Sequence, residues 1–346
     1  DLVRSRGLGD VYKRQVRYRL ILAELLMSNK MEKDAVEVLN QVLAKEANSY
    51  ASLMLYSYYL NVNNRTKAES YLDAPLLDPD LNIDEKVRVL AQYLGGYKND
   101  EEATKVIRWA GLIVKAHPED AKAWAFQGDF LNLNKQKKDA RQNYLKSLSI
   151  MSSNQQVWEQ VVLIDSELNE VDSVAKHAEK ALENFPTNGI MWFYKGRANL
   201  FQKKNQDAAN ALEAAKKYQS ENASLVFECN AMLGDLYNEL KQFKKSDAAY
   251  EEALAADPNS TVVLNNYSYF LSVRKEKLTL AKKMGEKLVE LEGDNPTYQD
   301  TYGWILYQLK EYDKAKEWLE KAAIKTGDAT VTVSYTHLRA HETVLD

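Results

Sequence analysis

Large apolar side chains recur along this chain at spacings of three and four residues, and the pattern itself repeats every 34 residues, as Trp124, Trp158 and Trp192 show. Spacings of three and four place side chains on one face of a helix. Each period holds two such amphipathic segments separated by a polar break, which predicts a pair of antiparallel helices. One pair is too small to bury its own apolar face, so we expect successive pairs to stack around a continuous core.

Within a period, certain positions also keep their residue type. The clearest period, 227–260, has large residues at positions 7, 11 and 24, small residues at 8, 20 and 27, and proline at 32; these are Leu233, Tyr237, Tyr250, Gly234, Ser246, Ala253 and Pro258. The small residues let two helices approach to about 8–10 Å, and the large ones fill the space around that contact. This arrangement resembles the tetratricopeptide repeat, a helix–turn–helix unit of the same length.

The resemblance covers nearly all of residues 16–331 and implies an all-α, right-handed superhelical solenoid of about nine units. The expected units are 16–49, 50–83, 84–120, 121–154, 155–188, 189–222, 227–260, 261–295 and 296–329. Four extra residues, 223–226, are expected to lengthen a helix or a turn. In unit 50–83, Pro75 is expected to end a shortened second helix, because proline interrupts helical hydrogen bonding. The run 75–83 then reads as a loop, where the superhelical pitch changes.

Both ends of the chain interrupt the repeat. Residues 5–15 and 333–343 can be encoded by opposite strands of one transposon-type sequencing adapter. We therefore expect residues 1–15 and 332–346 to be non-native flanks that add no packed core, and 16–331 to be the native repeat domain. On this interpretation the native N-terminus is missing, so the sequence does not indicate whether the protein has a signal peptide or a lipid anchor.

Composition restricts the candidate chemistry. The formal net charge of −4 does not provide the positive surface that nucleic-acid binding needs. Cys229 is the only cysteine, which excludes a disulfide framework, and it is expected to be a small packed residue. His117 is expected at a helix end, where it suits the helix dipole, and His177 at the surface or in packing. Gly95–Gly96 lacks the preceding strand of a phosphate-binding loop. We predict no catalytic residue, cofactor, metal site or membrane span.

The resemblance points instead to a binding surface. In tetratricopeptide repeats, positions 2, 5, 9, 12 and 13 of each first helix line a concave groove. The candidate groove residues here are Asp129, Asn132, Glu159, Phe193, Arg197, Asp235, Asn238, Glu239, Asn265, Tyr269, Asp300, Trp304 and Tyr307. Relatives that grip a terminal carboxylate carry Lys at position 5 with Asn at 9, and this chain lacks that combination in its central units.

The groove chemistry indicates a class of partner. Its acidic and amide-rich centre favours a basic or hydrogen-bonding extended segment of a protein or peptide. Tyr269, Trp304 and Tyr307 offer the aromatic anchors that are common in interfaces. The alternative is that these three rings pack against neighbouring helices.

The leading hypothesis for function is a non-enzymatic scaffold that holds a protein or an extended peptide in the concave groove. One alternative is the interaction arm of a larger enzyme, such as a glycosyltransferase, peptidase or sensor kinase, with its catalytic domain outside this fragment. Another is a structural component of a bacterial envelope assembly complex. The repeats resemble those of bacterial envelope proteins, which favours the periplasm or an outer-membrane lipoprotein over the cytoplasm.

Overall fold

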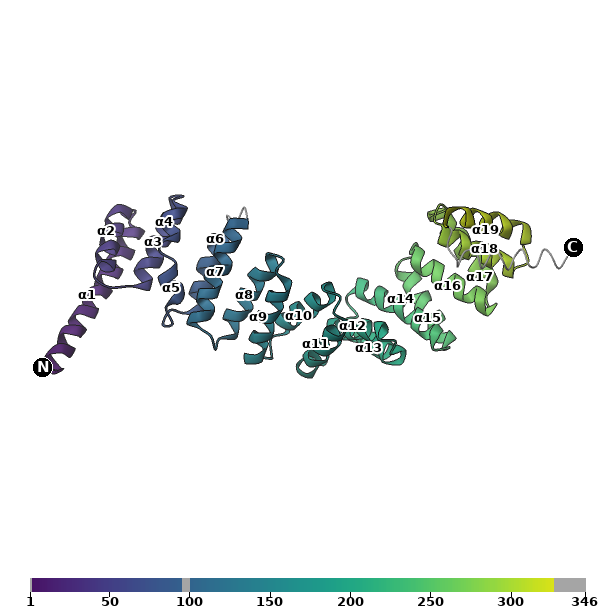
Figure 1. The fold of residues 1–346 in the computed structure, drawn as a ribbon, viewed down its shortest axis with the longest axis horizontal. Coiled ribbons are helices and arrows are strands. Elements are labelled where there is room, and N and C mark those ends of the chain that lie inside the picture. The colour runs from purple at the N-terminus through teal and green to yellow at the C-terminus, as the bar shows by residue number, and fades with distance from the viewer. Residues whose placement is uncertain (1, 95–99, 327–346) are drawn as a thin grey trace. The chain divides into compact units, whose positions relative to one another are not determined.

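The computed structural model describes residues 2–94 and 100–326, and every regular element in these ranges is an α-helix (Figure 1). The chain divides into two compact units, residues 1–164 and 165–346. The first unit contains α1 (Leu2–Ser28), α2 (Glu32–Leu43), α3 (Ser49–Asn61), α4 (Arg65–Glu69), α5 (Asp73–Leu77), α6 (Ile83–Leu94), α7 (Asp100–Ala116), α8 (Ala121–Leu133), α9 (Lys137–Ile150) and most of α10 (Gln155–Glu167). The second contains α11 (Val171–Asn184), α12 (Gly189–Phe201), α13 (Asn205–Tyr218), α14 (Ala223–Glu239), α15 (Phe243–Ala256), α16 (Thr261–Arg274), α17 (Leu278–Leu291), α18 (Pro296–Gln308) and α19 (Tyr312–Thr326).

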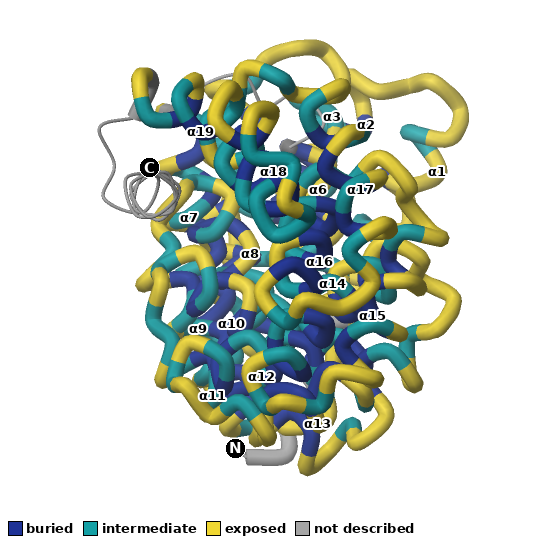
Figure 2. Tube along the Cα trace, turned by 90° about the vertical axis from the view of Figure 1, so that its right-hand side faces the viewer, coloured by how far each residue is buried: buried dark blue, intermediate teal, exposed yellow. Residues whose placement is uncertain are grey.

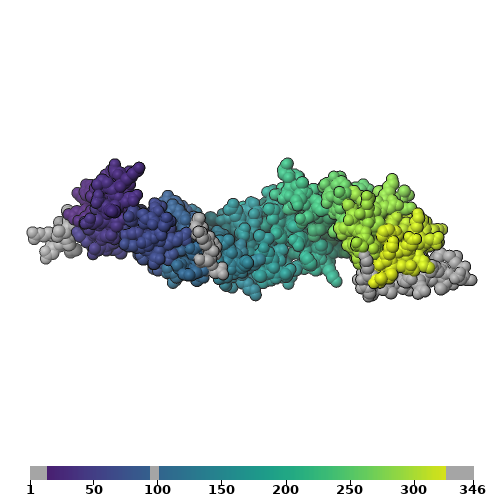
Figure 3. All heavy atoms as spheres, turned by 90° about the horizontal axis from the view of Figure 1, so that it is seen from above, coloured from purple at the N-terminus to yellow at the C-terminus, as the bar shows by residue number. Residues whose placement is uncertain are grey.

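In the described ranges the helices follow the predicted periods as nine consecutive pairs, with α4 and α5 together in the place of one helix. Within each compact unit a helix packs on its partner and on the next pair, as α12, α13, α14 and α15 do in turn. Segments that follow one another in sequence are therefore neighbours in space within a unit (Figure 3). The prediction of an all-α repeat architecture is confirmed.

The three tryptophans that mark the period have the same environment. The indole Nε1 of Trp124 donates to the carbonyl of Pro118 at 2.8 Å, and Trp192 donates in the same way to Pro186 at 2.8 Å. Trp158 donates to the carbonyl of Ser152 at 2.9 Å, again six residues upstream. Each indole thus closes the loop that leads into its own helix, which confirms that the 34-residue interval is a structural period.

The predicted close contact at position 8 is also present. A Cβ atom added to Gly128 would lie 2.7 Å from the ring of Tyr144, and one added to Gly303 would lie 2.7 Å from Leu319. Gly234 faces Tyr250 in the same way. The side chain at position 24 therefore lies directly on the backbone at position 8. Buried and exposed stretches alternate along the helices, as the amphipathic pattern requires (Figure 2).

In seven of the pairs, the tight turn between the two helices follows one rule that the sequence analysis did not include. Position 15 has positive φ in a residue other than glycine, for example Lys135 at 61°, Asn169 at 56° and Lys241 at 58°. The next residue donates back across the turn, as the amide of Gln242 does to the carbonyl of Tyr237 at 2.8 Å. This is the Schellman ending of a helix, which normally prefers glycine at the left-handed position.

The expectation for Pro75 was wrong. The second helix of that pair ends earlier, at Glu69, and Pro75 lies inside the short helix α5. Proline is tolerated there because the first turn of a helix needs no amide donor. Tertiary contacts hold α5: Arg108 pairs with Asp73 at 2.7 Å, and Trp109 Nε1 donates to the same carboxylate at 2.9 Å.

Other boundary expectations have different outcomes. The extra residues 223–226 lengthen a helix, since α14 begins at Ala223. Helix α1 runs without a break across the proposed flank boundary at residue 15. Gly95–Gly96 and the flank 332–346 lie outside the described residues. The pitch change at 75–83 stays a prediction.

Candidate partner-binding surfaces

Two of the predicted groove acids bind to their own repeat. Tyr144 donates its hydroxyl to Asp129 Oδ1 at 2.7 Å, and Tyr250 donates to Asp235 Oδ1 in the equivalent repeat. Asn266 Nδ2 also donates to Asp235, at 3.1 Å. Burial raises the pKa of both carboxyls, and the tyrosine hydrogen bonds act against that rise. These two side chains therefore fasten the first helix to the second, which gives them a structural role at positions 9 and 24.

The other polar candidates make contacts closer to the surface. Glu159 accepts from Gln155 at 3.0 Å, and Glu239 accepts from the amide of Asn205 on the preceding repeat. In the first compact unit, Asn132 donates to Gln160 at 3.3 Å. An exposed glutamate such as Glu239 can replace its hydrogen bond to a neutral side chain by an ion pair with a basic group at low cost. The tyrosine-bound carboxylates of Asp129 and Asp235 cannot.

Arg197 and Phe193 lie on α12 in different environments. Phe193 is 8% exposed and belongs to the core, so little of its ring is available to a partner. The guanidinium of Arg197 lies 5.7 Å from that ring. Arg197 also lines a pocket of about 190 Å³ together with Ser166, Tyr194 and Phe201.

Phe201, which the sequence analysis left out, is 67% exposed. It occupies position 13 of repeat 189–222, which is one of the five positions that line the groove in tetratricopeptide repeats. The repeat position alone would therefore have identified Phe201 as a candidate. No ion pair to Arg197 is present among the described residues. An uncovered ring therefore lies in one pocket with an uncompensated cation.

The candidates in the last two repeats are partly packed. Trp304 and Tyr307 stack with ring centroids 5.4 Å apart and planes at 20°, and Tyr312 contacts Tyr307 edge-on at 5.6 Å. Tyr269 is 42% exposed and lies against Phe270. These contacts support the packing role for part of the aromatic set, and the role of interface anchor stays a prediction.

The remaining polar candidates are Asn238, Asn265 and Asp300. Asn238 accepts from Arg274 at 3.2 Å, and Arg274 also pairs with Asp247. Asn265 donates to Asn266 at 3.2 Å. Asp300 is half-buried on α18. The Arg274 contacts link two neighbouring repeats, whereas the Asn265 contact stays within α16.

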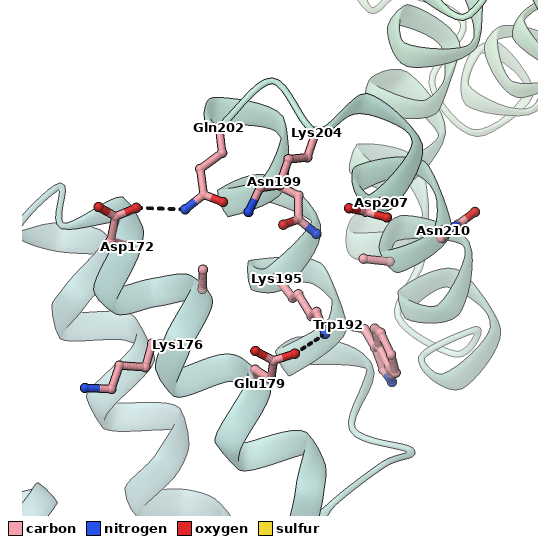
Figure 4. A pocket seen from close by; sticks show the side chains of 12 residues that line it. Asp172, Lys176, Glu179, Trp192, Lys195, Asn199, Gln202, Lys204, Asp207 and Asn210 are labelled. Carbon is pink, nitrogen blue, oxygen red and sulfur yellow. Dashed lines mark hydrogen bonds and ion pairs between the residues drawn. The ribbon is translucent and has the colours of Figure 1, made fainter.

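A separate polar cleft lies between α11, α12 and α13, away from the groove positions (Figure 4). Its volume is about 580 Å³. Lys195 and Glu179 pair across it at 3.2 Å, and the Lys195 ammonium lies 5.3 Å from the Trp192 ring centroid. Gln202 donates to Asp172 at 2.8 Å at the other end. The lining offers both hydrogen-bond donors and acceptors.

Two buried ionisable contacts were missed by the sequence analysis. His177 Nδ1 lies 2.6 Å from Asp165 Oδ2, although the carboxylate is 12 residues upstream and on another helix. His177 is therefore a packed, hydrogen-bonded residue and not a surface one. His117 follows the end of α7 as expected, but it also contacts the buried Lys86 at 2.8 Å. Cys229 is buried, and burial raises the pKa of its thiol to about 12, which confirms its role as a packed residue.

The described residues bring together no group of three His, Cys, Asp or Glu side chains suited to hold a metal ion. None of the described helices combines the length and the apolar character needed to cross a lipid bilayer.

Comparison with known proteins agrees with this geometry. Two profiles of the family "Tetratricopeptide repeat" match, one at residues 227–260 and 298–323 and the other at 167–224. These segments of the chain are tetratricopeptide repeats. Repeats of this kind generally serve as non-catalytic modules that bind proteins or peptides.

Two curated relatives are longer than this chain. A TPR repeat-containing protein of Pseudomonas aeruginosa is 26% identical over 162 residues, which are 46% of this chain and 27% of that protein. The human protein O-mannosyl-transferase TMTC3 is 23% identical over 314 residues, which are 75% of this chain and 33% of the enzyme. The chain thus spans about a third or less of each relative.

Solved structures with a similar backbone fold include tetratricopeptide-repeat proteins. The TPR protein YrrB has a TM-score of 0.49 at 18% identity, over 56% of this chain and 97% of that one. The C-terminal part of a TPR repeat-containing protein from Cytophaga hutchinsonii has a TM-score of 0.47 at 19% identity, over 70% of this chain and 98% of that one.

Proposed function

We propose that this chain is a non-enzymatic scaffold whose concave groove holds an extended segment of a partner protein. The observation that carries the proposal is the Phe201 ring, which is 67% exposed beside Arg197 at groove positions of one helix. Aromatic and arginine side chains dominate the binding energy of protein interfaces, particularly where they line a pocket. A segment lying along the first helices would cover both side chains.

The charges favour a segment of mixed character. Arg197 would take an acidic side chain, and its pocket of about 190 Å³ has room for one apolar side chain beside it. Glu239, which is exposed and bound to the neutral Asn205, would take a basic one. Trp304 and Tyr307 would contact the segment at the last repeat. A purely basic segment is less favoured than the groove sequence suggested, because tyrosines already bind Asp129 and Asp235.

A library of random peptides displayed on phage tests the proposal with the intact chain as bait. For a selected peptide, Phe201→Ala, Arg197→Ala and Trp304→Ala should each weaken binding by about 2 kcal/mol, the scale of an interface hot spot. Tyr218→Ala is the matched control, because Tyr218 is 38% exposed on the second helix of the same repeat as Phe201. Peptides whose affinity depends on Tyr218 and ignores all three groove variants would disprove groove binding.

A second proposal is that the chain is the interaction arm of a larger enzyme. It is supported by the alignment of 75% of this chain with a third of a human O-mannosyl-transferase. On this reading the repeats bind and orient a protein substrate while catalysis takes place in another domain. Sequencing the complete reading frame decides the matter: an adjoining catalytic domain would support the arm, and repeats alone would leave the free scaffold.

A further inference from the structure

The polar cleft between α11 and α12 lies where the neighbouring repeat has a tyrosine. In repeat 227–260, position 11 is Tyr237, which is 6% exposed. Its hydroxyl donates to Glu213 Oε1 at 2.9 Å, across the boundary to the preceding repeat. The phenol ring thus fills the space between a first helix and the second helix before it.

One boundary earlier, between repeats 155–188 and 189–222, the carboxylate of this arrangement is present but the tyrosine ring is not. Position 11 of repeat 189–222 is Asn199, and Glu179 occupies the place that corresponds to Glu213. Asparagine is far smaller than tyrosine, and the space is open: Glu179 and Asn199 both line the cleft of about 580 Å³ (Figure 4). Other repeats fill position 11 with an apolar side chain, such as Leu271 and Leu306, both fully buried.

The cleft also holds polar groups that lack partners. Asn199 is 7% exposed, and among the described residues no hydrogen bond to its carboxamide is found. Gln202 Oε1 is buried and likewise has no donor within reach in the described part of the chain. Buried polar groups are nearly always hydrogen-bonded, so these atoms suit a ligand that brings its own donors and acceptors.

We propose that this cleft receives a tyrosine side chain from a partner protein. The phenol ring would occupy the space that Tyr237 fills one repeat later, beside Trp192 and Lys195. Its hydroxyl would donate to Glu179, whose carboxylate can keep Lys195 at the same time because it accepts several hydrogen bonds. Asn199 and Gln202 would bind the backbone next to the tyrosine. A phenylalanine would leave Glu179 without this donor, so the site discriminates by the hydroxyl.

This proposal does not depend on the concave groove, and its test uses different residues. N-acetyl-L-tyrosinamide and N-acetyl-L-phenylalaninamide are titrated into the intact chain while the indole resonance of Trp192 is followed by NMR. We expect the tyrosine probe to shift this resonance and to bind roughly tenfold more tightly than the phenylalanine probe, since hydrogen bonds to charged groups have this magnitude. Equal binding of the two probes, or no binding of either, would overturn the proposal.

Variants locate the site. Asn199→Tyr should fill the cleft from within, abolish tyrosinamide binding and raise the melting temperature. Glu179→Ala should remove the tenfold preference without affecting the phenylalanine probe, and it gives an answer even if Asn199→Tyr fails to fold. Glu183→Ala, an exposed glutamate one turn further along α11, is the matched control and should keep the preference. Retention of the preference in Glu179→Ala would place the probe elsewhere.

Discussion

Lys86 Nζ lies 2.8 Å from His117 Nε2, and the lysine is completely buried. The same ammonium donates to the carbonyl of Leu76 at 3.1 Å and to that of Asp78. An ammonium group can only donate, so His117 accepts through Nε2 and is neutral, with its proton on Nδ1. One buried cation thus fastens the end of α5 and the following turn to helices α6 and α7.

The first prediction concerns this lysine and pH. Burial lowers the pKa of Lys86 from 10.5 to about 8, so between these values the unfolded chain binds more protons than the folded one. Stability should therefore rise as pH increases from 8 to 10.5, by at most about 3 kcal/mol for this group. Below the ordinary histidine value of 6.5, the lowered pKa of His117 should reduce stability as pH falls.

Denaturant unfolding of Lys86→Met and of the unmodified chain across this pH range measures the difference. The variant should lack the rise between pH 8 and 10.5. Lys115→Met is the control, because Lys115 is exposed on α7 and should leave the rise in place. Parallel curves for Lys86→Met and the unmodified chain would show that Lys86 does not titrate in this way.

The second prediction concerns the left-handed turn residues. Lys241 has φ of 58°, a conformation that costs an L-residue about 1–2 kcal/mol and glycine very little. Lys241→Gly should stabilise the chain by about 0.5–1 kcal/mol after the added freedom of the unfolded chain is deducted. Lys244→Gly, three residues later in the exposed face of α15, should instead destabilise it by about 1 kcal/mol. Equal effects of the two substitutions in thermal unfolding would contradict the assigned turn.

The third prediction concerns the contact at position 8. A side chain at Gly234 would enter the ring of Tyr250, so Gly234→Leu should cost about 1–3 kcal/mol through overpacking. Hydrogen exchange should show the loss mainly in α14, α15 and their neighbours, because contacts in a solenoid are local. Exchange that stays unchanged there, or that accelerates evenly along the chain, would count against this packing.

The fourth prediction separates structural from binding acids in the groove. Asp235→Lys should destabilise the fold by about 1–3 kcal/mol, because it leaves the Tyr250 hydroxyl and Asn266 without their acceptor. Glu239→Lys should leave stability within about 0.5 kcal/mol, as expected for a surface change. Once a peptide is selected, Glu239→Lys should mainly slow its association, and more so at low salt. An Asp235→Lys variant as stable as the unmodified chain would show that the Asp235 carboxylate has no structural role.

The sequence by itself determined the architecture. A 34-residue period with small residues at fixed positions leaves one way to bury the apolar faces, which is to stack helix pairs. The positions of Trp124, Gly234 and Tyr250 followed from that period because local spacing sets which helix face a residue occupies. Cys229, alone and in an apolar helix, was correctly expected to be packed.

Tertiary structure decided which polar side chains remain available. Asp235 and Glu239 lie one turn apart on α14, but Tyr250 binds Asp235, whereas the exposed Glu239 accepts from the neutral Asn205 side chain. The partners of Lys86 and His177 come from other helices, so no local spacing indicates them. The short helix α5, which contains Pro75, is held through Asp73 by Arg108 and Trp109, which follow 35 and 36 residues later in the chain. The period determines where a residue lies on its helix, whereas the use of its charge depends on which groups the packed helices bring within about 3 Å of it.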